Sequence, residues 1–286
     1  TFKSRIRRCF QLLIRINYTE RKKYNLNLQP DKYKVSIMLE YFIVCPLVFL
    51  AGFIDAIAGG GGLISLPAYL IAGLPPHMAI GTNKFSACMG TIVATWHYAR
   101  RGFINIRRVW PAVLTALLGS WAGAKLALMV PSDIFQIVML VILPLTAVFI
   151  TRCKALQSDK PALPEGKTMI IIMLLSLLIG VYDGFYGPGT GTFLMILLIY
   201  LARIGLNEAA GTTKIINLST NVAALAVFLV HGEVLFPLAV VAAVFGIAGN
   251  YIGANFFTNK GKNIARPVIM LVLAIMFVKI ILDLTS

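Results

Sequence analysis

Long runs of apolar residues, separated by short polar stretches, dominate the chain. The clearest runs cover residues 111–130, 134–150 and 267–282, close to the roughly 18 to 20 residues that cross a hydrocarbon core as a helix. They lack the strict alternation of apolar and polar residues that indicates a β-strand. The pattern therefore predicts an all-α integral membrane protein.

Other helices are predicted near residues 35–58, 85–99, 168–186, 214–230 and 236–257. Two apolar pieces, 63–74 and a piece that ends near 204, are too short to span and follow glycine-rich stretches. Each is expected to form a broken or re-entrant helix with its neighbour. The predicted domains are a basic amphipathic extension (1–34), a first membrane repeat (35–151), a polar linker (152–167) and a second membrane repeat (168–286). Together they predict about eight transmembrane helices in two four-helix repeats.

Three sequence blocks recur in the same order in the two halves. Gly-x-x-Asp-x-x-x-Gly-x-Gly begins at Gly52 and again at Gly180, and Ala-x-Gly-Thr-x-Lys begins at Ala79 and Ala209. Gly-x-x-x-Gly-Ala begins at 119 and 249. This last pattern is typical of closely packed membrane helices, and packing is our interpretation of it.

Charge is scarce and concentrated in a few places. Only 13% of the residues are charged, against about 25% in a soluble domain. The net charge of +15 comes largely from the first 34 residues and from short connections. This placement follows the positive-inside bias and argues against nucleic acid as a partner. It predicts an inner (plasma) membrane protein whose N-terminus, 100–108 loop and 152–167 linker are cytoplasmic.

The first residues combine Arg5, Arg7 and Arg8 with apolar positions at helical spacing, such as Phe2 and Ile6. We interpret the segment as an interfacial helix that binds anionic lipid. A disordered basic tail and a remnant of an organelle-targeting sequence are the alternatives.

Glycine-rich breaks in apolar sequence are the main candidates for a transport site. Matching breaks in two repeats are the best pointer to one, because a break in a bilayer exposes backbone groups that lipid cannot satisfy. A half-helix that starts after the break points its N–H groups and positive dipole end at the site, which favours an anion. The predicted substrate-binding residues are Gly59, Gly60, Gly61, Gly62, Asn83, Lys84, Gly187, Gly189, Thr190, Gly191, Thr212, Thr213, Lys214 and Asn217.

Charged residues accompany each break. Asp55 and Asp183 precede the breaks by one turn, where a carboxylate at mid-helix costs about 2.5–3.5 kcal/mol on insertion scales. They are predicted either to couple transport to a proton or cation, or to hold the loop by accepting its hydrogen bonds. Lys84 and Lys214 are expected to begin the next helix and to offer positive charge to an oxyanion. Snorkelling of both lysines to the interface is the competing interpretation.

Catalytic and cofactor motifs are missing from the sequence. There is no Gly-x-x-x-x-Gly-Lys-Ser/Thr, His-Glu-x-x-His or Gly-x-Ser-x-Gly. The four cysteines have no metal-binding or redox spacing. We therefore expect no enzyme activity, no cofactor and no metal.

At the repeated motifs the chain resembles the sulfite exporter TauE/SafE family, most closely its YfcA-type branch. Residues 51–63, Pro67 and residues 79–84 resemble the amino-terminal signature, and residues 182–192 resemble the carboxy-terminal one. The resemblance covers roughly residues 40–284. It implies about eight helices in two repeats and transport of sulfur-containing anions such as sulfite, sulfoacetate or related organosulfonates.

The leading hypothesis is a secondary transporter of small sulfur-containing anions that works by alternating access around the two broken helices. An anion channel and a non-transporting membrane scaffold or assembly protein are the alternatives. The direction of transport, the coupling ion and the oligomeric state stay open, a homodimer being one option.

Overall fold

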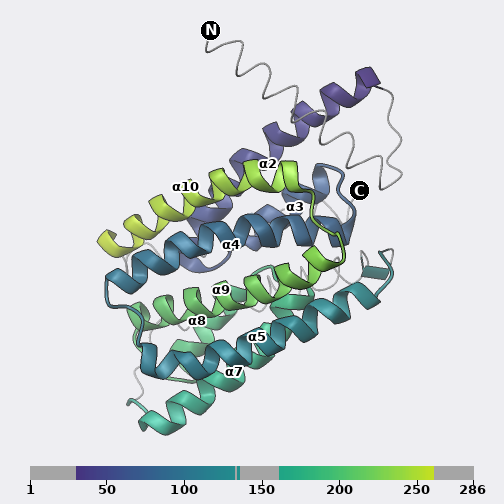
Figure 1. Ribbon diagram of the computed structural model, residues 1–286. Helices are drawn as coiled ribbons and strands as arrows, with labels where there is room; N and C mark the ends of the chain where they lie inside the picture. The colour runs from purple at the N-terminus through teal and green to yellow at the C-terminus, as the bar shows by residue number, and fades with distance from the viewer. Residues whose placement is uncertain (1–29, 133, 136–160, 261–286) are drawn as a thin grey trace, which may run out of the picture.

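Helices make up nearly all of the structure, a computed structural model that describes residues 30–132, 134–135 and 161–260. Within these described ranges, four helices precede residues 136–160 and four follow them (Figure 1). They are α2 (Pro30–Ala58), α3 (Gly62–Ile71), α4 (Pro76–Arg100), α5 (Ile106–Met129), α7 (Glu165–Phe185), α8 (Thr190–Tyr200), α9 (Leu206–Val230) and α10 (Phe236–Lys260). The order long, short, long, long therefore occurs on both sides of residues 136–160.

The predicted helices that fall within the described residues are found, with two systematic differences in their bounds. α4 begins at Pro76 instead of 85, and α9 begins at Leu206 instead of 214. Lys84 and Lys214 thus lie two turns inside their helices, about 12 Å from the first residue at 1.5 Å per residue. Nearly all of the predicted helix 134–150, all of the predicted helix 267–284, and most of the amphipathic extension and of the linker lie outside the described residues.

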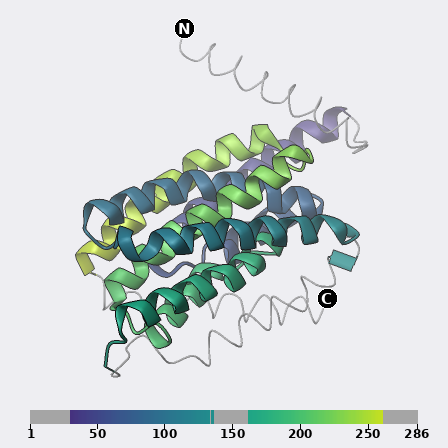
Figure 2. The same ribbon diagram turned by 60° about the horizontal axis from the view of Figure 1, so that its bottom comes forward.

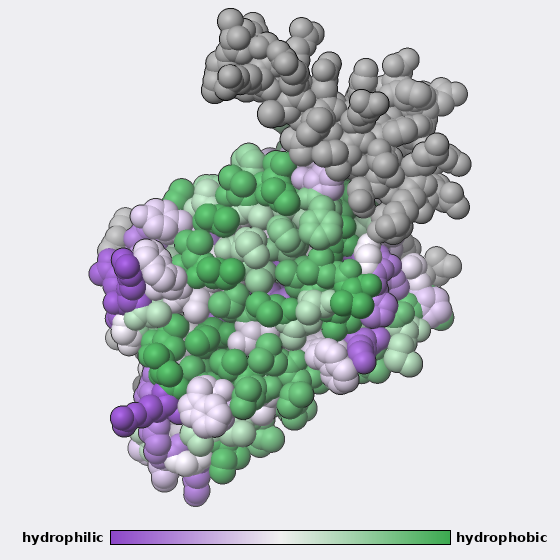
Figure 3. All heavy atoms as spheres, in the orientation of Figure 1, coloured by the Kyte–Doolittle hydropathy of each residue, from purple (hydrophilic) through white to green (hydrophobic). Residues whose placement is uncertain are grey.

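The helices present apolar side chains on their outer surface, as contact with lipid requires. Within the described ranges, five helices are long and apolar enough to cross a bilayer: α2 from Leu39, α5, α7, α9 and α10 to Thr258. Large apolar side chains such as Leu118, Leu178 and Val244 are exposed. Figure 3 shows a band of hydrophobic residues between two ends where hydrophilic residues gather. The protein is a multi-pass membrane protein.

The fourth helix of each half packs on the first helix of the other half. α5 lies along α7, and α10 lies along α2. A methyl group added at Gly123 would collide with the carbonyl oxygen of Val181, and one added at Gly249 would collide with that of Phe49. The glycines of the Gly-x-x-x-Gly patterns thus let two backbones approach closely, as interpreted from the sequence.

Matching helices in the two halves run in opposite directions. α4 and α9 lie side by side and antiparallel, because Thr95 bonds the carbonyl of Lys214 while Lys84 bonds Asn221. α5 runs parallel to both α7 and α9, whereas α2 and α4 run parallel to α10 (Figures 1 and 2).

These directions define two ends of the molecule. The basic end holds the 100–108 loop and the starts of α7 and α9, joined where Arg108 contacts Glu165 and Glu208 at 2.5 Å each. The end of α10 lies there too, since His97 contacts Thr258. The opposite end holds the start of α4 and the connection from α9 to α10, where Leu235 bonds Thr82.

One topological prediction needs correction. Because α2 runs parallel to α10, its residue Leu39 lies at the end opposite to the 100–108 loop. The reason is that α3 turns back after the break, so that α4 starts at the end where α2 started. The charge pattern predicted that the N-terminus and the 100–108 loop both face the cytoplasm. The start of α2 and that loop instead lie at opposite ends of the molecule.

Candidate functional site

The two helix breaks meet each other inside the molecule. Gly59, Gly187 and Gly189 have φ angles of 73°, 95° and 82°, a left-handed backbone that favours glycine. A Cβ atom on Gly191 would lie 2.6 Å from the Cα of Gly59, and one on Gly62 would lie 3.2 Å from the Cα of Pro188. Glycine is therefore required both by the turn and by the contact between the breaks.

Side chains from elsewhere satisfy the backbone carbonyls that the breaks leave open. The Tyr98 hydroxyl donates to Ala56 at 2.6 Å, and the Thr192 hydroxyl donates to Ala58 at 2.8 Å. In the second break, Tyr182 donates to Pro188 at 2.6 Å and Thr190 to Gly187 at 2.6 Å. Such partners are necessary because lipid offers no hydrogen bonds.

Each half pairs its aspartate with the lysine of the other half. Lys84 Nζ lies 2.7 Å from Asp183 Oδ2, and Lys214 Nζ lies 2.7 Å from Asp55 Oδ2. Lys214 also donates to the backbone carbonyl of Asp55, near the C-terminal end of α2. A cation near a helix C-terminus is favourable because the helix dipole is negative there.

The side chains of Lys84 and Lys214 are only 3% and 2% exposed. The interpretation that they snorkel to the interface is therefore wrong. In this structure Asp183 and Asp55 neutralise the two lysine charges.

A small cavity lies beside the breaks, with a volume of about 60 Å³. A cavity of this size holds a few water molecules or one compact anion. Its lining residues are Val48, Ala51, Gly52, Asp55, Gly59, Gly61, Gly62, Ser65, Asn83, Lys84, Ser86, Ala87, Thr91, Asp183, Gly187, Thr190, Gly191, Asn217, Asn221, Gly246 and Asn250.

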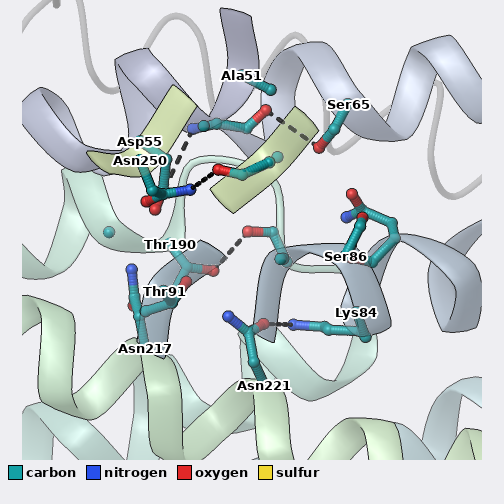
Figure 4. A pocket seen from close by; sticks show the side chains of 18 of the residues that line it. Ala51, Asp55, Ser65, Lys84, Ser86, Thr91, Thr190, Asn217, Asn221 and Asn250 are labelled. Carbon is teal, nitrogen blue, oxygen red and sulfur yellow. Dashed lines mark hydrogen bonds between the residues drawn. The ribbon is translucent and has the colours of Figure 1, made fainter. Parts of the chain in front are cut away.

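Polar side chains dominate two facing walls of this cavity. Figure 4 shows Asp55 and Asn250 on one wall, with Lys84, Asn217 and Asn221 on the other. Lys84 donates to Asn221 Oδ1 at 3.1 Å, and the Gly61 N–H donates to Asp55 Oδ1 at 3.4 Å.

Three cavity amides have unused hydrogen-bonding capacity. The buried side-chain oxygens of Asn83, Asn217 and Asn250 have no hydrogen-bond partner within the part of the chain that the structure describes. Buried polar groups are normally bonded, and a half-turn of an amide exchanges its oxygen for an NH₂ donor. Asn83 and Asn217 can therefore turn an NH₂ donor towards a guest that accepts hydrogen bonds, whereas the NH₂ of Asn250 already donates to the Gly246 carbonyl at 3.0 Å.

Most of the predicted site residues meet at this cavity. Of the predicted substrate-binding set, five do not line it: Gly60, Gly189, Thr212, Thr213 and Lys214. Gly189 is the residue before α8, and Lys214 lies behind Asp55.

Sequence reasoning missed several lining residues. Thr91 and Asn221 lie seven residues after Lys84 and Lys214, on the same helix face and at the same 130-residue offset as the second repeated block. Helical periodicity applied to the repeat could have found them. Asn250 carried only the weaker signal of an amide within an apolar run.

Comparison with known proteins identifies the family. The model of the sulfite exporter TauE/SafE family matches residues 44–280. The chain belongs to this family.

Curated relatives agree with the TauE/SafE assignment. The chain is 37% identical over 235 residues to the probable membrane transporter protein ORF9 of Sinorhizobium sp., which covers 82% of this chain and 90% of that protein. It is 32% identical over 251 residues to the probable membrane transporter protein YfcA of Escherichia coli K12, with coverage of 85% and 93%. The probable membrane transporter protein YdhB of Bacillus subtilis is 26% identical over 240 residues, with coverage of 83% and 97%. No solved structure matches this TauE/SafE chain.

Proposed function

We propose that this TauE/SafE membrane transporter moves small sulfur-containing anions, such as sulfite, sulfoacetate or related organosulfonates, and binds them in the cavity beside the two breaks. The observation that carries the proposal is the convergence of donors on that cavity. The N-terminal residues of α3 and α8, the ammonium of Lys84 and the amides of Asn83, Asn217 and Asn221 all line it.

This donor set is suited to an oxyanion. Helix N-termini present backbone N–H groups and a positive dipole end, and ammonium-to-oxyanion hydrogen bonds are among the strong ones in proteins. The cavity volume of about 60 Å³ favours an anion of few atoms. The sulfur chemistry of the substrate comes from the family name and not from the geometry.

Alternating access is the mechanism that the arrangement favours. In secondary transporters, inverted repeats place discontinuous helices at a shared site, and one repeat moves against the other around it. Here the matching helices α4 and α9 are antiparallel, and the two breaks touch beside the cavity. We therefore also propose that about eight helices in two inverted repeats cross the membrane.

The basic end is proposed to face the cytoplasm of a cell with an inner (plasma) membrane. It carries Arg100, Arg101, Arg107, Arg108, Arg203 and Lys260. The positive-inside bias counts such residues in short loops near the ends of spanning helices.

Thermal unfolding of the purified protein tests the proposed site. The ligand panel is sulfite, sulfate, thiosulfate, sulfoacetate, taurine, methanesulfonate and chloride. The intrinsic fluorescence of Trp96, Trp110 and Trp121 reports unfolding, because sulfite and thiosulfate react with thiol-reactive dyes. A ligand at 100 times its Kd adds about 2.7 kcal/mol of stability.

The decisive variant is Lys84→Gln/Asp183→Asn, which removes the cavity ion pair without leaving an unpaired charge. The matched control is Lys125→Gln, since Lys125 is an exposed lysine stacked over Trp121. Stabilisation by a sulfur oxyanion in the wild type and the control, lost in the double variant, supports the proposal. Absence of stabilisation by every anion overturns it, and equal stabilisation by chloride favours the channel alternative.

A further inference from the structure

The cavity contains a lysine that is already neutralised. Lys84 lies 2.7 Å from Asp183 and 3.1 Å from Asn221. Among the described residues, Lys84 is the one basic side chain that lines the cavity, because Lys214 lies outside the lining and is bound to Asp55. The ammonium keeps one further N–H donor, but its positive charge is already neutralised, so an anion that forms an ion pair with Lys84 competes with the Asp183 carboxylate.

Among the described residues that line the cavity, none offers a displaced Asp183 carboxylate a second cation. Besides Asp183, the ionisable side chains that line the cavity are Lys84 of α4 and Asp55 of α2. On α4, α5 and α9, the basic groups outside the lining are Lys214 of α9, Arg107, Arg108 and Lys125 of α5, and His77, His97 and Arg100 of α4. The other ionisable groups on or beside these helices include Glu208 of α9, Cys88 and Tyr98 of α4, and Tyr182 and Tyr186 near the second break. Lys214 is held by Asp55, and Lys125 is exposed over Trp121. On α10, the span to Thr258 contains no Asp, Glu, Lys or Arg, and neither does α8.

The displaced group is also cut off from water, since the Asp183 side chain is only 6% exposed. An ionised carboxylate left unpaired in such surroundings costs several kcal/mol, whereas a protonated carboxyl is neutral and keeps a donor and an acceptor. Protonation is therefore the least costly way to release Lys84.

We propose that binding of one anion at Lys84 is coupled to uptake of one proton at Asp183, so that the protein is a proton–anion co-transporter. This inference rests on the proposed function. In the step, the Lys84–Asp183 ion pair breaks, the anion forms an ion pair with Lys84, and one proton from solution binds the Asp183 carboxylate. For a monoanion the two added charges cancel, so the membrane potential does not drive its binding or transport.

Proton uptake upon anion binding tests this proposal. Sulfite or methanesulfonate is added to the full-length protein in weakly buffered detergent solution, with a pH indicator to count protons and calorimetry to count bound anions. Wild type and Asp183→Asn are compared, so that protons exchanged by sulfite itself are common to both. The control is Glu233→Gln, which removes a half-buried carboxyl in the connection between α9 and α10, outside the cavity lining.

The expected result is one more proton taken up per anion in the wild type and in Glu233→Gln than in Asp183→Asn. The Kd of the wild type for methanesulfonate should rise about tenfold per pH unit at alkaline pH, whereas that of Asp183→Asn should stay flat. If Asp183→Asn is unstable without a ligand, it is purified with methanesulfonate, and the pH series of the wild type still decides.

Two failures are distinguishable. Anion binding with equal proton counts, and a wild-type Kd independent of pH, overturns the coupling but leaves the proposed function standing. Failure of both anions to bind the folded wild-type protein overturns the proposed site, and the coupling with it.

Discussion

Replacing Lys214 by methionine should strongly destabilise the protein. At 2.7 Å and an effective dielectric constant of about 20, the gross attraction between Lys214 and Asp55 is about 6 kcal/mol. Part of this offsets the cost of burying both charges. Removing one partner of such a pair costs about 3–5 kcal/mol, because the other charge stays buried and unpaired.

Lys214→Met also removes a hydrogen bond to the backbone carbonyl of Asp55, which adds about 1 kcal/mol. Asp55→Asn should cost less, since Lys214 keeps that carbonyl and gains the amide oxygen as a partner. The double variant Lys214→Met/Asp55→Leu removes both charges and should recover most of the loss, because a buried pair is about as stable as well-packed apolar residues of similar size.

The assay is unfolding in mixed micelles with increasing denaturing detergent, with Lys125→Met as the control. Unfolding is followed by dye labelling of the buried Cys45 and Cys88, in a background in which Cys9 and Cys153 are replaced by serine. The double-mutant cycle gives the coupling energy between the two side chains. A loss below about 1 kcal/mol for Lys214→Met, or additive effects in the cycle, would refute the assignment of a buried, interacting pair.

Three further predictions follow from packing, topology and charge. Gly123→Leu should abolish folding, because the added side chain meets the carbonyl of Val181, whereas Gly205→Ala, with open space around it, should leave the yield of folded protein in a detergent extract unchanged. In a background without native cysteines, Asn105→Cys should resist a membrane-impermeant maleimide added to intact cells; labelling there would place the basic end outside. Burial raises the pKa of the Glu233 carboxyl above its usual range, so its contribution to stability is full below the ordinary pKa and is lost as pH rises through the raised pKa. Glu233→Gln should therefore raise the Tm near neutral pH but not at acidic pH, and an equal Tm at both would contradict this.

The repeated blocks made the positions of the breaks predictable. Glycine runs within apolar sequence have few explanations in a bilayer, so both breaks and their aspartates could be located from the sequence. The starts of α4 and α9 were not predictable in the same way. Their first two turns contain residues such as Asn83, Glu208 and Thr212, which look like a loop by hydropathy but are buried or half-buried in the protein interior.

The partners of the charged residues depend on tertiary packing. Each aspartate has a lysine later in its own half, and nothing in the sequence indicates that it binds the lysine of the other half. Hydropathy likewise does not show whether a helix of 10 residues such as α3 continues across the membrane or turns back. For this reason the sequence prediction placed the start of α2 at the same end as the 100–108 loop, whereas the structure places Leu39 at the opposite end.

The fourth helix of each half, α5 or α10, packs on the first helix of the other half. This arrangement has a consequence for the order of assembly during synthesis in the cell. α2 meets its partner α10 at contacts such as Phe49 with Gly249, which are 200 positions apart, so it enters the bilayer long before that partner exists. α5 and α7 meet at Gly123 and Val181, far closer in the chain, and can associate as soon as α7 has been inserted. Assembly should therefore start at the join between the halves and finish when α10 covers α2. A nascent chain truncated before α10 leaves the glycine-facing surface of α2 uncovered, and a membrane protease or chaperone would meet that surface first.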